Sequence, residues 1–118
     1  MTDITYHTPM KKLSDATDYN GVIYTAGQVA KDLNAGMKAQ TADVLRQIDA
    51  LLAKCGSNKS RILSATVYIT DMALKPAMDE AWMAWVDQTR PPSRATVEAR
   101  LGANVLVEIQ ITAAKITQ

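Results

Sequence analysis

Apolar residues in two stretches of the chain recur at steps of three and four, which is the spacing that places side chains on one face of a helix. The first stretch covers residues 38–55, and Gly56 follows it as a stop signal. The second begins around Pro76 and ends before Pro91-Pro92. We therefore expect two amphipathic helices. Their apolar stripes are Val44, Leu45, Ile48, Leu51, Leu52 and Cys55 in the first, and Met78, Ala81, Trp82, Trp85 and Val86 in the second.

Other stretches alternate apolar and polar residues, the pattern of half-buried strands. Residues 62–70 form one, and residues 94–100 and 105–115 form two more that we expect to pair as a hairpin. Near the N-terminus, Asn20-Gly21 separates residues 16–19 from 22–28, and this dipeptide favours a tight hairpin turn. The expected order of elements is ββ(β)αβαββ.

This order predicts an α+β fold in one domain covering residues 1–118. The two helices can cover only one face of a mostly antiparallel sheet. The opposite face carries Glu108 and Gln110 beside Thr66 and Tyr68, and it needs a partner. In so short a chain another copy of the same protein is the expected cover, so we expect a closed homo-oligomer with sites where subunits meet.

Composition excludes several functional classes. Thirteen Lys and Arg against twelve Asp and Glu give a net charge of +1 without a basic run, so nucleic acid is not expected as a principal ligand. One cysteine, Cys55, and one histidine, His7, supply neither a disulfide nor a metal cage. No apolar run is long enough for a membrane span, and the first residues lack a signal-peptide core. We expect a cytoplasmic protein without metal.

Two side chains carry candidate chemistry. Arg94 offers a planar fork that grips a carboxylate through two hydrogen bonds, and Glu108 could orient or deprotonate a water beside that anchored acid. Each also has a simpler interpretation, since Arg94 could be a surface arginine in an ion pair and Glu108 an outward charge on a strand. Thr96 suits either a hydrogen bond to a substrate carboxylate or an ordinary strand position.

Several segments resemble the RidA/YjgF family of reactive intermediate deaminases, also described as endoribonuclease L-PSP-like. They are YTAGQ at residues 24–28, the strand at 62–71, and PSR at 92–94 followed by VEI at 107–109. Residues 56–60 and 81–86 resemble the YoaB-like branch in particular. The resemblance implies a chorismate-mutase-like domain with a six-stranded sheet and two helices on one face. It also implies a homotrimer with a central β-barrel and ligand clefts between subunits.

The resemblance also implies an activity, namely hydrolysis of enamine and imine acids such as 2-aminoacrylate to a 2-oxo acid and ammonia without a cofactor. By matching positions, Arg94 is the carboxylate-binding arginine, Glu108 the water-holding glutamate, and Gly27 the glycine whose backbone follows the ligand. Four positions depart from the pattern. Ala26 replaces a serine, Thr96 a cysteine, Asp79 an asparagine and Leu13 a cleft-lining tyrosine.

These departures leave three functions to compare. The first is the imine deaminase, in which Arg94 and Glu108 act on a small carboxylate substrate. The second is a metabolite-binding or regulatory module that keeps the arginine pocket but turns over little, which Ala26 and Thr96 would permit. The third, a ribonuclease-like activity, fits poorly with the near-neutral charge and the single histidine, and it ranks last.

Overall fold

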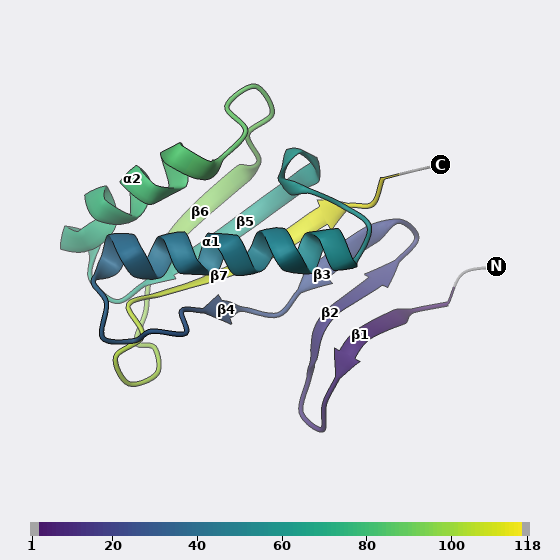
Figure 1. Ribbon diagram of the computed structural model, residues 1–118, viewed down its shortest axis with the longest axis horizontal. Coiled ribbons are helices and arrows are strands. Elements are labelled where there is room, and N and C mark those ends of the chain that lie inside the picture. The colour runs from purple at the N-terminus through teal and green to yellow at the C-terminus, as the bar shows by residue number, and fades with distance from the viewer. Residues whose placement is uncertain (1–2, 117–118) are drawn as a thin grey trace.

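The computed structural model describes residues 3–116 and shows one twisted sheet with two helices packed on it (Figure 1). The helices are α1 (Met37–Lys54) and α2 (Lys75–Trp85), and two short 3-10 turns cover Lys59–Arg61 and Met72–Leu74. The strands are β1 (Thr5–Pro9), β2 (Ser14–Tyr19), β3 (Val22–Thr25), β4 (Gln28–Val29), β5 (Ile62–Ile69), β6 (Ser93–Glu98) and β7 (Val107–Ala114).

The sheet follows the order β1-β2-β3-β7-β5-β6, and the two-residue strand β4 adds to β7 as a seventh member. All pairings are antiparallel except that of β5 with β6, which is parallel. The predicted hairpin between residues 94–100 and 105–115 is therefore wrong. β5 lies between the two strands, so α2 and its flanking loops act as the crossover that a parallel pair requires.

The helix boundaries follow from local signals. α1 begins after Gly36 and ends at Lys54, one residue before each predicted limit, and Gly56 with its φ of +84° follows the end of the helix as expected. α2 carries Pro76 in its first turn, where the missing N–H of proline leaves no helical hydrogen bond unmade. Its end at Trp85 precedes the extended residue Val86, and the two prolines at 91 and 92 lead the chain into β6.

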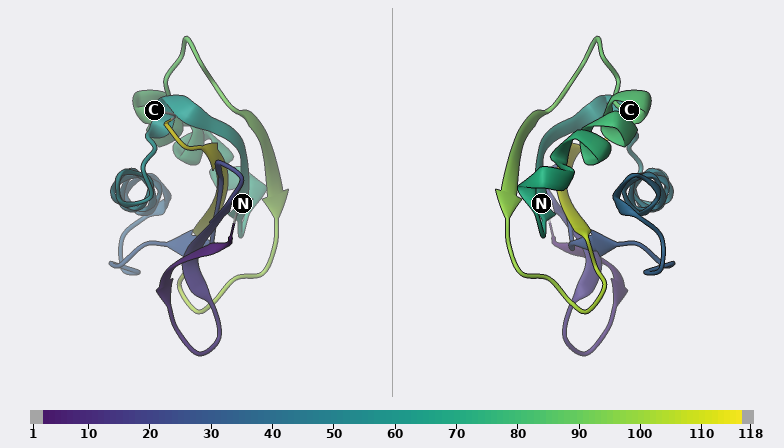
Figure 2. Two further views of the ribbon diagram at one scale, coloured as in Figure 1. Left: turned by 90° about the vertical axis from the view of Figure 1, so that its right-hand side faces the viewer. Right: turned by 90° about the vertical axis from the view of Figure 1, so that its left-hand side faces the viewer.

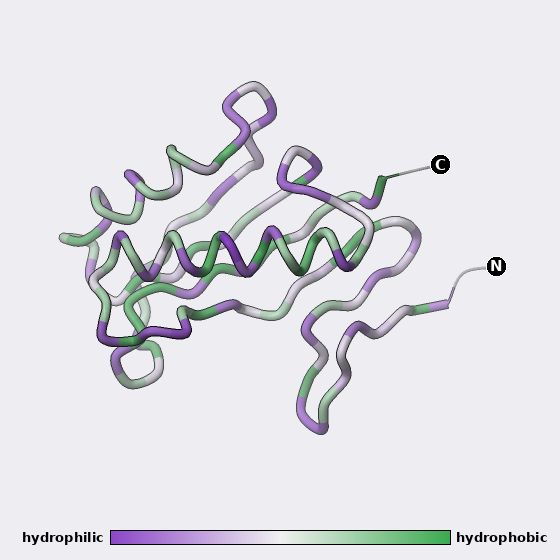
Figure 3. The backbone as a smooth tube through the Cα atoms, in the orientation of Figure 1, coloured by the Kyte–Doolittle hydropathy of each residue, from purple (hydrophilic) through white to green (hydrophobic). Residues whose placement is uncertain are grey.

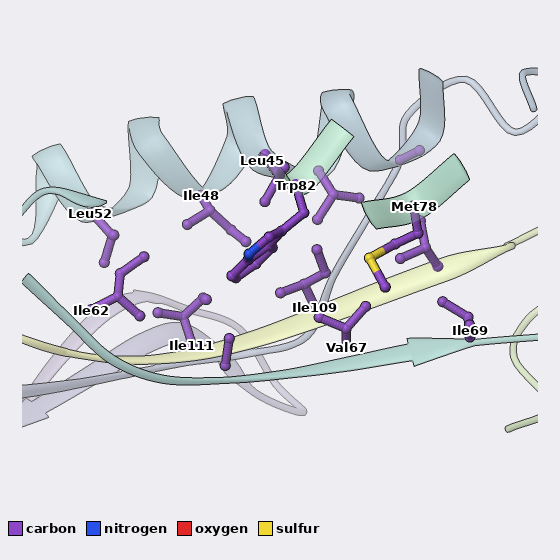
Figure 4. Packing of buried hydrophobic residues seen from close by; sticks show 14 of the residues in the cluster. Leu45, Ile48, Leu52, Ile62, Val67, Ile69, Met78, Trp82, Ile109 and Ile111 are labelled. Atoms are coloured by element: carbon purple, nitrogen blue, oxygen red, sulfur yellow. The ribbon is translucent and has the colours of Figure 1, made fainter. Parts of the chain in front are cut away.

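Both helices lie on the same side of the sheet (Figure 2). The core lies between the helices and β5 and β7 (Figure 4), and the predicted apolar column of the last strand is buried, with Val107, Ile109, Ile111 and Ala113 in this core. Colouring by hydropathy shows apolar and polar residues alternating along the turns of α1 (Figure 3), and its apolar residues Val44, Leu45, Ile48 and Leu52 belong to the core. The buried column consists of Val105, Val107, Ile109, Ile111 and Ala113.

Within residues 3–116, no helix covers the other face of the sheet. Tyr24 is aligned with Thr112 and Tyr68 with Glu108, so these side chains share the uncovered face. Tyr24 remains 47% exposed, and Val97, which is aligned with Tyr68, remains 40% exposed. This face therefore presents aromatic and aliphatic groups around the Glu108 carboxylate.

Candidate functional site

Arg94 lies on β6, the strand at one edge of the sheet. It is aligned with Ala65, whose side chain is buried under the helices, so Arg94 also points to the helix side of the sheet. Its Nη2 lies 2.8 Å from Oδ1 of Asp79, and its Nη1 lies 3.8 Å from the Sδ of Met78. The guanidinium carbon lies 5.2 Å from the centre of the Trp82 ring, a cation–π distance. The side chain is held on several sides, and 20% of it is exposed.

Asp79 is the electrostatic partner of Arg94. Its Oδ2 accepts a hydrogen bond of 2.6 Å from Lys75, one helical turn earlier. Its Oδ1 is buried and receives no well-aligned hydrogen bond, so the 2.8 Å approach of Arg94 is mainly a charge interaction. Burial acts to raise the pKa of Asp79, but hydrogen bonding from Lys75 and the nearby Arg94 charge outweigh it and lower that pKa. The carboxylate is therefore ionised at neutral pH and compensates the guanidinium.

Thr96 follows Arg94 on the same side of β6. It is aligned with the buried Val67 and is itself half-buried. We name Arg94, Asp79 and Thr96 the arginine half-site.

Trp82 was predicted from the sequence only as a residue of the apolar stripe, and the structure shows that its ring also lies against the Arg94 guanidinium. Helical spacing could have predicted this contact, because Trp82 follows Asp79 by three residues and therefore lies on the same face of α2.

Glu108 occupies the centre of the sheet on β7 and points to the face without helices. The carboxylate lies against the backbone of Gly27. A Cβ atom at Gly27 would overlap the side chain of Glu108, so a larger residue there would force the Glu108 carboxylate to move. Ala26 precedes it in the break between β3 and β4, where its N–H donates to the carbonyl of Asp15 at 2.8 Å. We name Glu108, Gly27 and Ala26 the glutamate half-site.

The two half-sites lie on opposite faces of the sheet, so a single chain does not bring Arg94 and Glu108 together. Within one chain, Leu13 belongs to neither half-site. It lies at the turn between β1 and β2, where its carbonyl accepts from Met10 N–H at 2.8 Å and its residue is 51% exposed. The resemblance implies a cleft between subunits for these residues, and within one chain they lie on two surfaces of the molecule.

Four further features concern a metal site, the single cysteine, the single histidine and a membrane span. Within residues 3–116, no cluster of three or more His, Cys, Asp or Glu side chains is arranged around a common metal position. Cys55 is buried among apolar residues, as its place on the first apolar stripe predicts, and burial raises the pKa of its thiol. His7 contacts Asp18 through Nε2 at 2.7 Å. Neither described helix combines the length and apolar composition of a bilayer-spanning segment.

Comparison with known proteins identifies the family. Residues 5–115 match the family model described as Endoribonuclease L-PSP. A RutC family protein of Haemophilus ducreyi is 48% identical over 104 residues, covering 87% of this chain and 89% of the relative. The RutC family protein YoaB of Escherichia coli is 46% identical over 102 residues, covering 86% of this chain and 89% of YoaB.

Solved structures agree with the sequence matches. The crystal structure of a member of the YjgF protein family from Neisseria meningitidis superposes with a TM-score of 0.93 at 44% identity, covering 98% of each chain. The yeast protein Mmf1 superposes with a TM-score of 0.88 at 20% identity, a likeness that concerns the fold alone. The α+β fold and the two-helix layer derived from the sequence are those of this group. The chain belongs to the endoribonuclease L-PSP family, which includes the RutC and YjgF proteins.

Proposed function

We propose that the protein hydrolyses small imine and enamine acids of the 2-iminopropanoate type to 2-oxo acids and ammonia. The observation that carries this proposal is the half-buried guanidinium of Arg94. It is held by Asp79 and Trp82 and still has donors for an incoming carboxylate. A 2-imino acid supplies that carboxylate one bond from its electrophilic carbon, so gripping the acid also fixes the reacting atom.

In the proposed reaction a water molecule attacks the imine carbon while Glu108 accepts one of its protons. A C–O bond forms as the C=N double bond becomes single, and the nitrogen takes up the proton from Glu108 to give a carbinolamine. The remaining hydroxyl proton then passes to the nitrogen through Glu108 as the C–N bond breaks, which releases ammonia and leaves the carbonyl of the 2-oxo acid. Water is the only co-reactant, and the reaction involves neither oxidation nor reduction. Glu108 suits this role because its carboxylate makes no ion pair within residues 3–116.

The site requires two protomers in this proposal. The β6 edge of one chain, with the arginine half-site, meets the uncovered face of the next chain, with the glutamate half-site. Such a contact is heterologous, and three of them close a ring. The exposed Tyr24 and Val97 on that face support the contact, because a monomer would leave their apolar surface in water. The proposed assembly is thus a homotrimer with three sites.

The first test is ammonia and 2-oxo acid release from a freshly generated imino acid. Arg94→Ala is expected to lower kcat/KM by about 30- to 1000-fold, the equivalent of about 2–4 kcal/mol for a charge-assisted anchor. Arg46→Ala is the matched control, since that arginine is 69% exposed on α1, and it should keep the wild-type rate. Equal rates for Arg94→Ala and the wild type would remove Arg94 from the mechanism.

A second test separates shared sites from sites within one chain. In this proposal Arg94→Ala and Glu108→Gln proteins each have strongly reduced turnover when assembled alone. When they are unfolded together at equal amounts and refolded, a random mixture gives about one quarter of sites two intact halves. Recovery of about a quarter of wild-type turnover is expected. Mixed trimers without any recovery would contradict a site built from two protomers.

A binding module with little turnover is the second candidate function. The observation in its favour is that Asp79 already neutralises Arg94, while Ala26 offers no side-chain hydroxyl to a substrate. Calorimetry with pyruvate distinguishes the two functions. Binding that depends on Arg94 without imine hydrolysis supports the module, whereas hydrolysis supports the enzyme.

A further inference from the structure

The outer layer of the molecule contains a hollow between α1 and α2 that plays no part in the proposed chemistry. Its volume is about 270 Å³, and the residues beneath it are mostly small or apolar. The two helices pack against each other here through alanines, and these leave space that longer side chains would fill. Figure 1 shows α1 and α2 side by side on one face of the sheet. The apolar residues are Ala42, Leu45, Ala81, Ala84 and Trp85.

One end of the hollow is a fixed aromatic wall. The indole Nε1 of Trp85 donates to Asp49 on α1 at 3.0 Å, which sets the orientation of its ring. The ring of Trp82 lies 5.4 Å away at an angle of 57°, so Trp85 is also supported from the core. A flat apolar group entering the hollow would therefore meet a preorganised aromatic surface, and aromatic pairs at such distances attract each other.

The charged side chains lining the hollow are all cationic, namely Lys38, Arg46 and Lys59. Lys38 already pairs with Glu80 at 2.6 Å, and Arg46 lies 3.4 Å from Asp43. Lys59 differs from both. Its ammonium lies 5.6 Å from the centre of the Trp85 ring, and within residues 3–116 it makes no ion pair.

We propose that this hollow binds a small aryl carboxylate, with the ring of the ligand against Trp85 and its carboxylate at Lys59. The volume suits a ligand of about one aromatic ring, slightly below the usual range for larger metabolites. The charge pattern selects an anion, since Lys59 gains a partner that the chain itself does not provide. This inference does not rest on the proposed deaminase activity.

The chain supplies its own reporter for the test, because Trp82 and Trp85 are its only tryptophans and they lie next to each other. Phenylacetate is titrated into the intact protein while tryptophan emission is followed, and calorimetry provides a second measurement. We expect a saturable change with a Kd in the millimolar range or below. Phenylacetamide, the neutral analogue, should bind at least about threefold more weakly, as should phenylacetate to Lys59→Gln.

Two leucine variants locate the binding. Ala84→Leu fills the hollow from an exposed position on α2 and is expected to abolish the response. Ala53→Leu makes the same change on α1 outside the hollow and should bind as the wild type does. Circular dichroism confirms that each variant is folded.

The Arg94→Ala variant tests whether phenylacetate binds at the arginine half-site instead of in the hollow. Binding of phenylacetate that survives Arg94→Ala and disappears in Ala84→Leu supports the proposal. Loss of binding in Arg94→Ala with retention in Ala84→Leu overturns it, because the ligand would then occupy the arginine half-site. Absence of any saturable response in the folded wild type also overturns it.

Discussion

Replacing Asp79 with asparagine is expected to tighten the binding of a 2-oxo acid at Arg94. The Asp79 carboxylate lies 2.8 Å from the guanidinium and is held ionised by Lys75 and Arg94. An incoming carboxylate must therefore share Arg94 with a negative charge that the chain already provides. Asparagine keeps the shape of the side chain and removes that charge, so the ligand meets a guanidinium that is less neutralised.

The size of this effect follows from the geometry. Two unit charges about 4 Å apart attract by roughly 4 kcal/mol at an effective dielectric constant of about 20. The side chains of Arg94 and Asp79 are 20% and 31% exposed, so solvent screens part of this attraction. A net change of about 1–2 kcal/mol remains, which corresponds to a Kd about 5- to 30-fold lower.

Calorimetric titration with pyruvate measures this Kd directly. Glu80→Gln provides a matched control, because Glu80 is the next residue of α2 and its side chain is 64% exposed in a pair with Lys38. That variant should bind pyruvate as the wild type does. If a folded Asp79→Asn protein binds pyruvate equally or more weakly, Asp79 does not compete with the ligand. It would then act by orienting Arg94.

Two further predictions concern the glutamate half-site and the loop after α2. Gly27→Ala is expected to reduce imine hydrolysis at least tenfold without loss of folding, because the new Cβ must displace Glu108, whereas Gly36→Ala has open space and should leave the rate unchanged. Ser60→Ala should raise the pKa of Asp87, which hydrogen bonding from Ser60 above all now holds at about 2, toward its ordinary value of 3.8 in an NMR titration. Since this pKa is depressed by folding, its contribution to stability is complete above pH 3.8 and is lost as the pH falls toward 2, so acid unfolding of Ser60→Ala should begin at higher pH.

Periodicity predicted both helices and the long strands β5 and β7, because each of these elements buries one side against the core. The stripe of α1 and the column Val105 to Ala113 had to face a core, and both are buried. Strand pairing was harder to predict. Residues 94–100 and 105–115 are adjacent in sequence and looked like a hairpin, but the order of strands depends on packing energies across the whole sheet. The position of β5 between these two strands depends on tertiary packing, and no local sequence pattern predicts it.

The candidate site shows the same limit. Arg94 and Glu108 could be selected from the sequence by the chemistry of their side chains and by resemblance. Their separation could not, because it depends on the pairing of β5 with β6 in parallel and with β7 in antiparallel orientation. Likewise, Gly27 was predicted to follow a ligand, whereas its contact with the Glu108 carboxylate appears only when β4 is placed beside β7.

The separation of the two charged groups has a physical advantage. An ion pair between Arg94 and Glu108 would cost each group much of its capacity to bind a substrate or a water. Opposite faces prevent that pairing within a chain. Asp79 meanwhile compensates the half-buried guanidinium, which avoids the cost of a desolvated charge without a partner. The arginine thus remains ionised and oriented at the β6 edge, where a ligand carboxylate needs only to compete with a partly screened aspartate.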